Sequence, residues 1–516
     1  MTARDETTIV IDGASLTIDA VVAVARGRAR VALADAARER MVRSNAIVNQ
    51  IVERNDVVYG VTTGFGKLSD IAIPPHRLAE LQVNLVRSHA AGVGPFLSEA
   101  ETRAMMLLRA NVIAKGFSGA RPVLVEQLLA MLNAGLYPQV PEQGSVGASG
   151  DLAPLARLAL SLIGEGTLCD GDRVGPADEM LRAHGIEPVV LGPKEGITLI
   201  NGTQAHTAVA ALLVHDARTI WRAAHAAAAM TLEALMGTPV AFDERIQRAR
   251  GQLGQEVSAS VMRVLLADSE IRESHRSNDR RVQDAYGLRC VPQVHGAVLD
   301  GLEWIAGMVE RELNAATDNP LVFDDGTMLS GGNFHGQPVA MALDVLAIVL
   351  TNLAVMSERR TDRVVHPDLN EGLPAFLSPD AGTNSGFMMA QVTAAALTSE
   401  CKVLAHPASV DSIPTDGSKE DVVPMAMGAA WKARRIRDNV RNAIAIELMC
   451  AAQGIDFRKP LRPGRGVAIA HDVVRAVVAP LERDRVLSGD IEAIAREIAA
   501  GAFDLCFRDA TPGGAA

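Results

Sequence analysis

Apolar residues recur at spacings of three and four along most of the chain, which is the period of one face of an α-helix. In the first 200 residues this pattern predicts helices near Ile18 and over 33–54, 78–92 and 152–163. From Asn201 onward the pattern is almost wholly helical and rich in Ala. It predicts long helices over 203–236, 293–314, 336–363, 384–405 and 424–453.

Only the N-terminal part contains strand-like segments. The run from Thr8 to Ile11 predicts a strand and Asp12-Gly13 a turn, with Ser15 to Thr17 as the returning strand. The predicted fold class is therefore mainly α, with a central bundle of long helices and a smaller mixed α/β N-terminal part. The predicted parts are residues 1–200, residues 201–455 with the bundle, and residues 456–516, where the Gly/Ala tail after Thr511 is expected to be disordered.

Composition agrees with a helical protein. Aromatic residues make up only 3% of the chain, whereas strands recruit aromatic and β-branched side chains. The net charge is −11 and no basic stripe interleaved with aromatics appears, which argues against a nucleic-acid partner. The five cysteines are scattered without CxxC spacing, so we expect reduced core residues rather than disulfides or metal ligands.

One segment, from Pro338 to Met356, is apolar enough to suggest a membrane span. Asp344 and Asn352 interrupt it, and a helix that is apolar on most of its circumference is typical of the centre of a large bundle. The N-terminus has no sustained apolar run, so no signal peptide is expected. The sequence therefore predicts a cytoplasmic protein without a membrane partner.

The loop from Gly144 to Asp151, GSVGASGD, carries distinctive chemistry. A phosphate-binding P-loop would end in Gly-Lys-Ser/Thr and a nucleophile elbow needs Gly-x-Ser-x-Gly, and Asp151 disagrees with both. A plain surface turn is one remaining interpretation, and self-condensation is the other. In the second, the Gly150 nitrogen approaches the Ala148 carbonyl in a tight turn. Ring closure and loss of water from Ser149 would then leave an electrophilic methylidene-imidazolone.

The sequence resembles the histidine/phenylalanine/tyrosine ammonia-lyase and aminomutase family over essentially the whole chain. The matching blocks are YGVTTGFG at Tyr59, LQVNLVRSHAAGVG at Leu81, GSVGASGDLAPLA at Gly144, INGTQ at Ile200, QDAYGLRCVPQVHGA at Gln283, NFHGQP at Asn333 and SVDSIPTDGSKED at Ser409. The resemblance implies a helical fold of the ammonia-lyase/fumarase type and a homotetramer whose active sites combine loops from more than one subunit. It also implies a 4-methylidene-imidazol-5-one group formed from Ala148, Ser149 and Gly150, with no external cofactor and no metal. The serine-loop signature of the fumarase and aspartase group is not found.

The resemblance assigns catalytic roles to two of the three tyrosines. Tyr59 matches the family's catalytic base, and a tyrosinate can take that role if nearby positive potential lowers its pKa. Tyr286 matches a loop tyrosine that assists the chemistry near the cofactor. Without the resemblance, each would be interpreted as an amphipathic tyrosine that anchors a loop.

Four further residues are assigned to the cofactor or the substrate by the resemblance. Asn201 would contact the cofactor's oxygen, although alone it also suits a helix N-cap before Thr203. Phe334 would pack against the cofactor. Arg289 would hold the substrate carboxylate with two hydrogen bonds rather than form a surface ion pair, and Gln283 lies in the same substrate loop.

Two positions indicate which amino acid is the substrate. Ser88-His89 resembles the Ser-His pair of the histidine enzymes, although a buried, hydrogen-bonded histidine is the simpler interpretation of His89. Glu420 could hydrogen-bond an imidazole, and the tyrosine and phenylalanine enzymes have glutamine there. Alone, Glu420 would be interpreted as a solvated loop acid. Lys419 and Val422 depart from the histidine pattern, and Val422 resembles the tyrosine enzymes.

The sequence thus predicts a carbon–nitrogen lyase that eliminates ammonia from L-histidine to give urocanate. A tyrosine or phenylalanine ammonia-lyase, a tyrosine aminomutase and a catalytically inactive relative stay open as alternatives. The cofactor would engage either the substrate's amine or its ring, and the sequence does not separate these two mechanisms.

Overall fold

The computed structural model describes residues 8–507 except residues 55, 278 and 280. They form two compact units whose segments alternate along the chain. The first unit takes its residues from Met1–His215, Ile305–Asp344 and Pro407–Trp431, and the second from Asp216–Trp304, Val345–His406 and Lys432–Ala516. The three-part division of the sequence stays a prediction, and its expected disordered tail after Thr511 lies outside the described residues.

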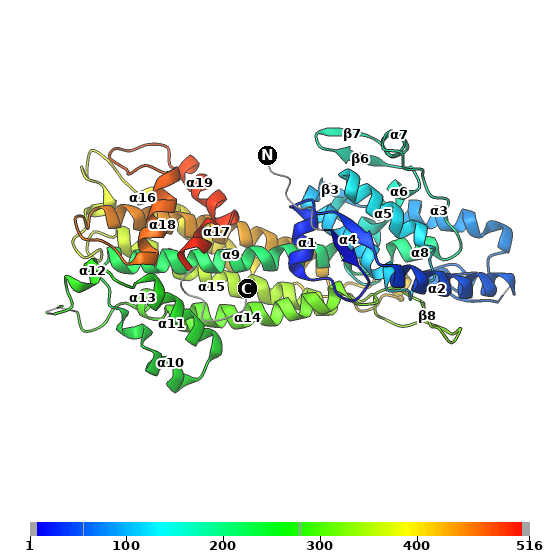
Figure 1. The fold of residues 1–516 in the computed structure, drawn as a ribbon, viewed down its shortest axis with the longest axis horizontal. Helices are drawn as coiled ribbons and strands as arrows, with labels where there is room; N and C mark the ends of the chain where they lie inside the picture. The colour runs from blue at the N-terminus through cyan, green and yellow to red at the C-terminus, as the bar shows by residue number, and fades with distance from the viewer. Residues whose placement is uncertain (1–7, 55, 278, 280, 508–516) are drawn as a thin grey trace. The chain divides into compact units, whose positions relative to one another are not determined.

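The first unit combines helices with short strands (Figure 1). Its helices are α1 Ile18–Ala25, α2 Asp35–Glu53, α3 Leu78–His89, α4 Glu99–Ala114, α5 Pro122–Ala134, α6 Leu152–Leu162, α7 Ala177–Ala183 and α8 Glu195–Ile200. Its strands are β1 Ile9–Ile11, β2 Val31–Leu33, β3 Val93–Phe96, β4 Leu136–Pro138, β5 Pro141–Gln143, β6 Thr167–Asp170, β7 Arg173–Pro176, β8 Leu321–Val322 and β9 Met328–Leu329. The expected mixed α/β character of the N-terminal part is confirmed.

The strands form small sheets rather than one layer. β3 pairs with β5 and β8 with β9 in antiparallel fashion, and β4, β6 and β7 form a three-stranded antiparallel sheet in that order. The helix α4 is buried on every side from Glu101 to Ala114, and Ser98 and Glu101 start it with a reciprocal capping box. This buried helix forms the core against which α1 and α5 pack.

The predicted return strand over residues 15–17 is wrong. The strand β1 pairs in parallel with β2 instead. The Asp12 carboxylate accepts the backbone N–H groups of Ala14 and Ser15, which makes a side-chain-capped turn where a hairpin was expected. Thr17 then accepts a backbone N–H as the N-cap of α1, so it begins a helix and cannot continue a strand.

The five long helices predicted after Asn201 are confirmed. They are α9 Gln204–Ala234, α14 Val291–Leu313, α15 Gln337–Val365, α16 Met388–Leu404 and α17 Ala426–Asp456. Within the second unit, the buried Arg360 of α15 pairs with Glu447 of α17 at 2.6 Å, and Thr231 of α9 donates to the same carboxylate at 2.9 Å. Trp221 of α9 donates to the carbonyl of His295 in α14 at 2.8 Å. These bonds tie the second unit into a helical bundle (Figure 1), as the mainly α fold class requires.

Shorter elements complete both units. The second unit also holds α10 Glu244–Arg250, α11 Leu253–Leu265, α12 Glu270–Glu273, α13 Tyr286–Arg289, α18 Arg465–Val477 and α19 Ser488–Ala499. Single-turn 3₁₀ segments are η1 Gly66–Leu68, η2 Pro75–Arg77, η3 Pro239–Phe242, η4 Ala375–Leu377, η5 Asp416–Ser418 and η6 Ala502–Phe507. Among the described residues, α15 alone is long and apolar enough to cross a membrane, and 56% of its most apolar window is buried inside the structure.

Candidate active site

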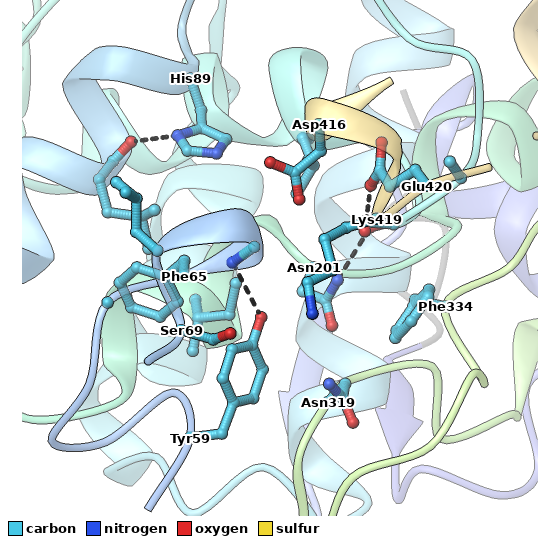
Figure 2. Close-up of a pocket in the computed structure, with 18 of the residues that line it drawn as sticks. Tyr59, Phe65, Ser69, His89, Asn201, Asn319, Phe334, Asp416, Lys419 and Glu420 are labelled. Atoms are coloured by element: carbon cyan, nitrogen blue, oxygen red, sulfur yellow. Dashed lines mark hydrogen bonds between the residues drawn. The ribbon is translucent and has the colours of Figure 1, made fainter. Parts of the chain in front are cut away.

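A cavity of about 1020 Å³ lies in the first unit. It collects residues that the sequence assigned to catalysis, the cofactor or the substrate, and six of them come from six separate stretches of the chain. These six are Tyr59, His89, Ser149, Asn201, Phe334 and Glu420. Figure 2 shows five of them by label around the cavity. Ala148 also lines it, and Gly150 follows directly in the loop.

The loop from Ala148 to Gly150 is held in a tight turn between β5 and α6. The Ser149 carbonyl accepts a hydrogen bond from Asn201 Nδ2 at 2.9 Å, and the N–H of Asp151 donates to the Gly202 carbonyl at 2.7 Å. Gly150 has φ +74, and a Cβ there would stand 2.1 Å from the Gly202 oxygen. Only glycine fits this position, because both the backbone conformation and the contact with Gly202 exclude a side chain.

The loop also fits the proposed five-membered ring. If the ring that the resemblance implies forms, the Ala148 carbonyl oxygen would leave as water and the Ser149 carbonyl oxygen would be the only oxygen on the ring. Asn201 already donates to that atom. The helix α6 begins at Leu152, directly after the loop, so its positive end would strengthen an electrophile formed there.

Asn201 does not cap α9. It stands at the C-terminal end of α8, and α9 begins only at Gln204, so its amide is available to the loop. The Asn201 carbonyl in turn accepts from Arg109 Nη1 at 2.9 Å. Burial lowers the pKa of the Arg109 guanidinium to about 10. The buried Arg109 thus fixes Asn201, which in turn holds the loop from Ala148 to Gly150.

Tyr59 is half-buried in the loop before η1, and its hydroxyl accepts the Gly66 N–H at a long 3.5 Å. Burial raises the pKa of Tyr59 most strongly, the Gly66 N–H lowers it, and the carboxylates of Asp416 and Glu420 raise it further. The net direction is upward. The expected positive potential at Tyr59 is therefore not supplied by the first unit, where neighbouring carboxylates act in the opposite sense.

His89 ends α3 with its ring facing the cavity (Figure 2). Its Nδ1 lies 2.8 Å from the Leu85 carbonyl, an acceptor, so Nδ1 carries the proton of the neutral ring. The lone pair of Nε2 is then left to accept from a ligand. His89 is hydrogen-bonded, as the simpler interpretation requires, but it is only partly buried and lines the cavity.

Glu420 links its own loop to the loop from Ala148 to Gly150. Its carboxylate accepts from the Ser149 hydroxyl and, through the other oxygen, from the Thr415 hydroxyl. Thr415 and Glu420 also form an isolated β-bridge. These contacts hold the Glu420 carboxylate beside Ser149. A freely solvated loop acid would have no such fixed position.

The cavity also contains polar residues that sequence reasoning did not assign. They are Ser69, Asn84, Ser88, Asn319, Ser330, His335, Asp416, Lys419 and Asp421. Asp416 and Lys419 share the loop of Glu420, which was the available signal, whereas nothing in the local pattern marked Ser69 or Asn319. Three carboxylates and one ammonium line this part of the described structure, so the charge balance favours a ligand that carries positive charge.

Gln283, Tyr286 and Arg289 are not among the residues that line this cavity. They belong to the second unit. Tyr286 is 70% exposed, and the Arg289 guanidinium stacks 4.6 Å from the centre of its ring. The roles assigned to these three residues therefore stay predictions.

Comparisons with known proteins identify the family of the chain. The sequence pattern of the family described as aromatic amino acid lyase matches residues 16–476. The histidine ammonia-lyase of Anaeromyxobacter dehalogenans is 55% identical, covering 96% of this chain and 100% of the relative. The crystal structure of histidine ammonia-lyase from Trypanosoma cruzi matches with a TM-score of 0.91 at 44% identity, over 98% of this chain and 96% of that one.

A tyrosine aminomutase is similar as well. The crystal structure of that enzyme from Streptomyces globisporus matches with a TM-score of 0.93 at 38% identity, over 98% of this chain and 100% of that one. The fold is thus shared by lyases and aminomutases, and the resemblance deduced from the sequence blocks is confirmed. The chain belongs to the aromatic amino acid lyase family.

Proposed function

We propose that this chain eliminates ammonia from L-histidine, giving urocanate, with an electrophile that it forms from Ala148, Ser149 and Gly150. One observation carries the proposal. Ala148 and Ser149 face the same cavity as Tyr59, His89 and Glu420. An electrophile, a base and two groups suited to an imidazole would therefore surround one bound amino acid.

Ring formation needs no outside reagent. The Gly150 nitrogen bonds to the Ala148 carbonyl carbon, and its proton moves to the carbonyl oxygen. That oxygen then leaves as water with the amide proton of Ser149, forming a C=N bond. Ser149 finally loses its α-proton and its hydroxyl as a second water, which leaves the methylidene group. The tight turn at Gly150 and the hydrogen bond from Asn201 to the Ser149 carbonyl support this sequence.

The finished group would supply an electrophilic alkene that makes the substrate's nitrogen a better leaving group. Tyr59 would remove the β-proton, which is too weakly acidic to leave without a positioned base. Asn201 would hold the oxygen of the ring, and Phe334 would cover its face. Each of these residues lines the cavity, which supports the assignments.

Histidine is favoured over tyrosine by two polar groups. Nε2 of His89 and the carboxylate of Glu420 offer an acceptor and a negative charge for an imidazole N–H or imidazolium. The curated relatives at 48–55% identity are named histidine ammonia-lyase, which supports the same choice. Val422 also lines the cavity and favours the alternative, a tyrosine ammonia-lyase or tyrosine aminomutase.

We further propose that the protein is a cytoplasmic homotetramer. Arg289 would hold the substrate carboxylate from the loop of another subunit, and Gln283 and Tyr286 would enter the site with it. In support, Tyr286 is an aromatic residue at the start of the short helix α13 of the second unit, and yet it is exposed. A second copy would also bring the positive charge that Tyr59 lacks within the first unit.

The substrate assignment is tested by incubating the purified protein separately with L-histidine, L-tyrosine and L-phenylalanine. Released ammonia is followed and the products are identified by mass. Urocanate from histidine, with little product from the other two, is the expected result. Coumarate or a β-amino acid from tyrosine, with histidine inert, would make Val422 the better guide to the substrate than His89 and Glu420.

Glu420→Gln is expected to lower kcat/KM for histidine by about 10- to 100-fold, because it removes the charge that faces the imidazole. The thermal midpoint should barely change, since glutamine keeps an oxygen that can accept from the Thr415 hydroxyl. Initial rates with histidine and thermal unfolding give both quantities. Glu492→Gln, an exposed acid of α19, is the matched control. Unchanged kinetics in Glu420→Gln would remove Glu420 from the site.

A further inference from the structure

Asp151 is a buried carboxylate directly after the cofactor-forming triad. It is fully buried, and it accepts hydrogen bonds from four groups. The Ser145 hydroxyl donates at 2.7 Å, and the backbone N–H groups of Ala205 and His206 donate at 2.8 and 3.0 Å. The fourth donor is the His206 ring, whose Nδ1 lies 2.8 Å from the carboxylate. Asp151 thus caps the first turn of α9 from a distant part of the chain.

The His206 side chain is as deeply buried as its partner. Both side chains are 0% exposed. The other ring nitrogen, Nε2, faces Gly336, and a Cβ added to that glycine would lie 2.8 Å from Nε2. The ring is therefore closely packed beside Asp151. Burial raises the pKa of Asp151, but pairing with His206 and the hydrogen bonds lower it more, so the carboxylate is kept ionised.

The Asp151–His206 pair controls the shape of the loop. The Ser145 hydroxyl that donates to Asp151 also accepts the N–H of Gly147, so the stretch before the triad depends on the same carboxylate. The N–H of Asp151 is bonded to Gly202 at 2.7 Å, which fixes the stretch after the triad. The triad is therefore anchored on both sides through a single residue, and His206 holds that residue.

We propose that His206 is a positioning residue for the maturation of the cofactor loop, which rests on the proposed function. By holding Asp151 at the start of α9, His206 keeps the Gly150 nitrogen in reach of the Ala148 carbonyl carbon. Ring closure within a chain is fast when the reacting atoms are pre-oriented, and a misplacement of about 1 Å costs on the order of a hundredfold. His206 takes no part in the proton transfers that release the two waters.

Three variants separate this role from ordinary core packing. His206→Leu has a similar volume but lacks the ring N–H that donates to Asp151, and His206→Asn restores a side-chain N–H close to the position of Nδ1. Ser145→Ala removes a different donor from the same carboxylate and leaves the core intact. His225→Leu is the control, because His225 is an equally buried histidine of the second unit.

The experiment measures maturation and stability separately. Full-length protein is purified at successive times after a short induction, and intact mass gives the fraction that has lost two waters. Thermal unfolding of the same samples reports stability. We expect His206→Leu to mature about ten- to a hundredfold more slowly than the wild type, Ser145→Ala to be slowed less, and His206→Asn to recover most of the rate. His225→Leu should lose stability and mature at the wild-type rate.

If His206→Leu and Ser145→Ala are folded and mature as fast as the wild type, the positioning role of His206 is wrong while the proposed function stands. If His206→Leu does not fold, the rates of Ser145→Ala and His206→Asn decide in its place. If the wild type itself keeps both waters, the proposed function fails, and the maturation role of His206 fails with it.

Discussion

Ser149→Ala is expected to abolish turnover while leaving the fold intact. Alanine has no hydroxyl to lose, so the methylidene group cannot form. The loss of rate should be on the order of a thousandfold or more, the scale seen when an enzyme loses its reactive group. The backbone bonds that hold the loop, from Asn201 to the Ser149 carbonyl and from Asp151 to Gly202, do not use the hydroxyl. The fold should therefore survive the change.

Intact mass makes this prediction specific. The wild type should be lighter than its sequence by two water molecules, and Ser149→Ala should keep the water that the hydroxyl would have given. Ser161→Ala is the matched control, since it removes a buried hydroxyl from α6 without touching the cavity. It should keep both the mass loss and the activity. Substantial residual turnover in Ser149→Ala, or a wild type of unmodified mass, would contradict the proposed chemistry.

Local sequence pattern predicted the long helices after Asn201 well because it records their buried faces, but it predicted neither α4 nor α5. The five long helices after Asn201 lie within a few residues of their predicted bounds, since burial fixes where the apolar residues stand. The return strand over residues 15–17 failed for the opposite reason. Its short run carried no clear alternation, and the turn was decided by the carboxylate of Asp12 and the cap at Thr17.

The candidate site could be predicted where one residue carries its own chemistry. Ser149 and Tyr59 stand in Gly-rich loops whose composition excludes regular structure, which made them visible in the sequence. Asp151 and His206 were not predicted, because 55 residues separate them and each fits its local segment as an ordinary residue. The position of Arg289 relative to the cavity could not be predicted from the sequence either. A motif places it beside Tyr286, but no local pattern says which cavity their loop reaches.

Tyr59→Phe is expected to lower kcat by about 100- to 10,000-fold, the usual contribution of a general base. Unlike Ser149→Ala, it should still lose two waters on maturation, because Tyr59 takes no part in ring closure. Tyr137→Phe is the matched control. Tyr137 lies in β4 and is not among the residues lining the cavity, so its variant should keep near wild-type activity. A Tyr59→Phe enzyme with near wild-type kcat would exclude Tyr59 as the base.

The pH dependence of kcat/KM also tests whether Tyr59 is the base. A base acts when deprotonated, so kcat/KM should rise with pH as Tyr59 ionises. Burial and the carboxylates of Asp416 and Glu420 raise the Tyr59 pKa, so the rise should lie on the alkaline side. Asp416→Asn removes one of those negative charges and should move the rise to lower pH. Ionisation of the free substrate's amine would not respond to that change, so an unmoved profile in Asp416→Asn would assign the rise to the substrate rather than to Tyr59.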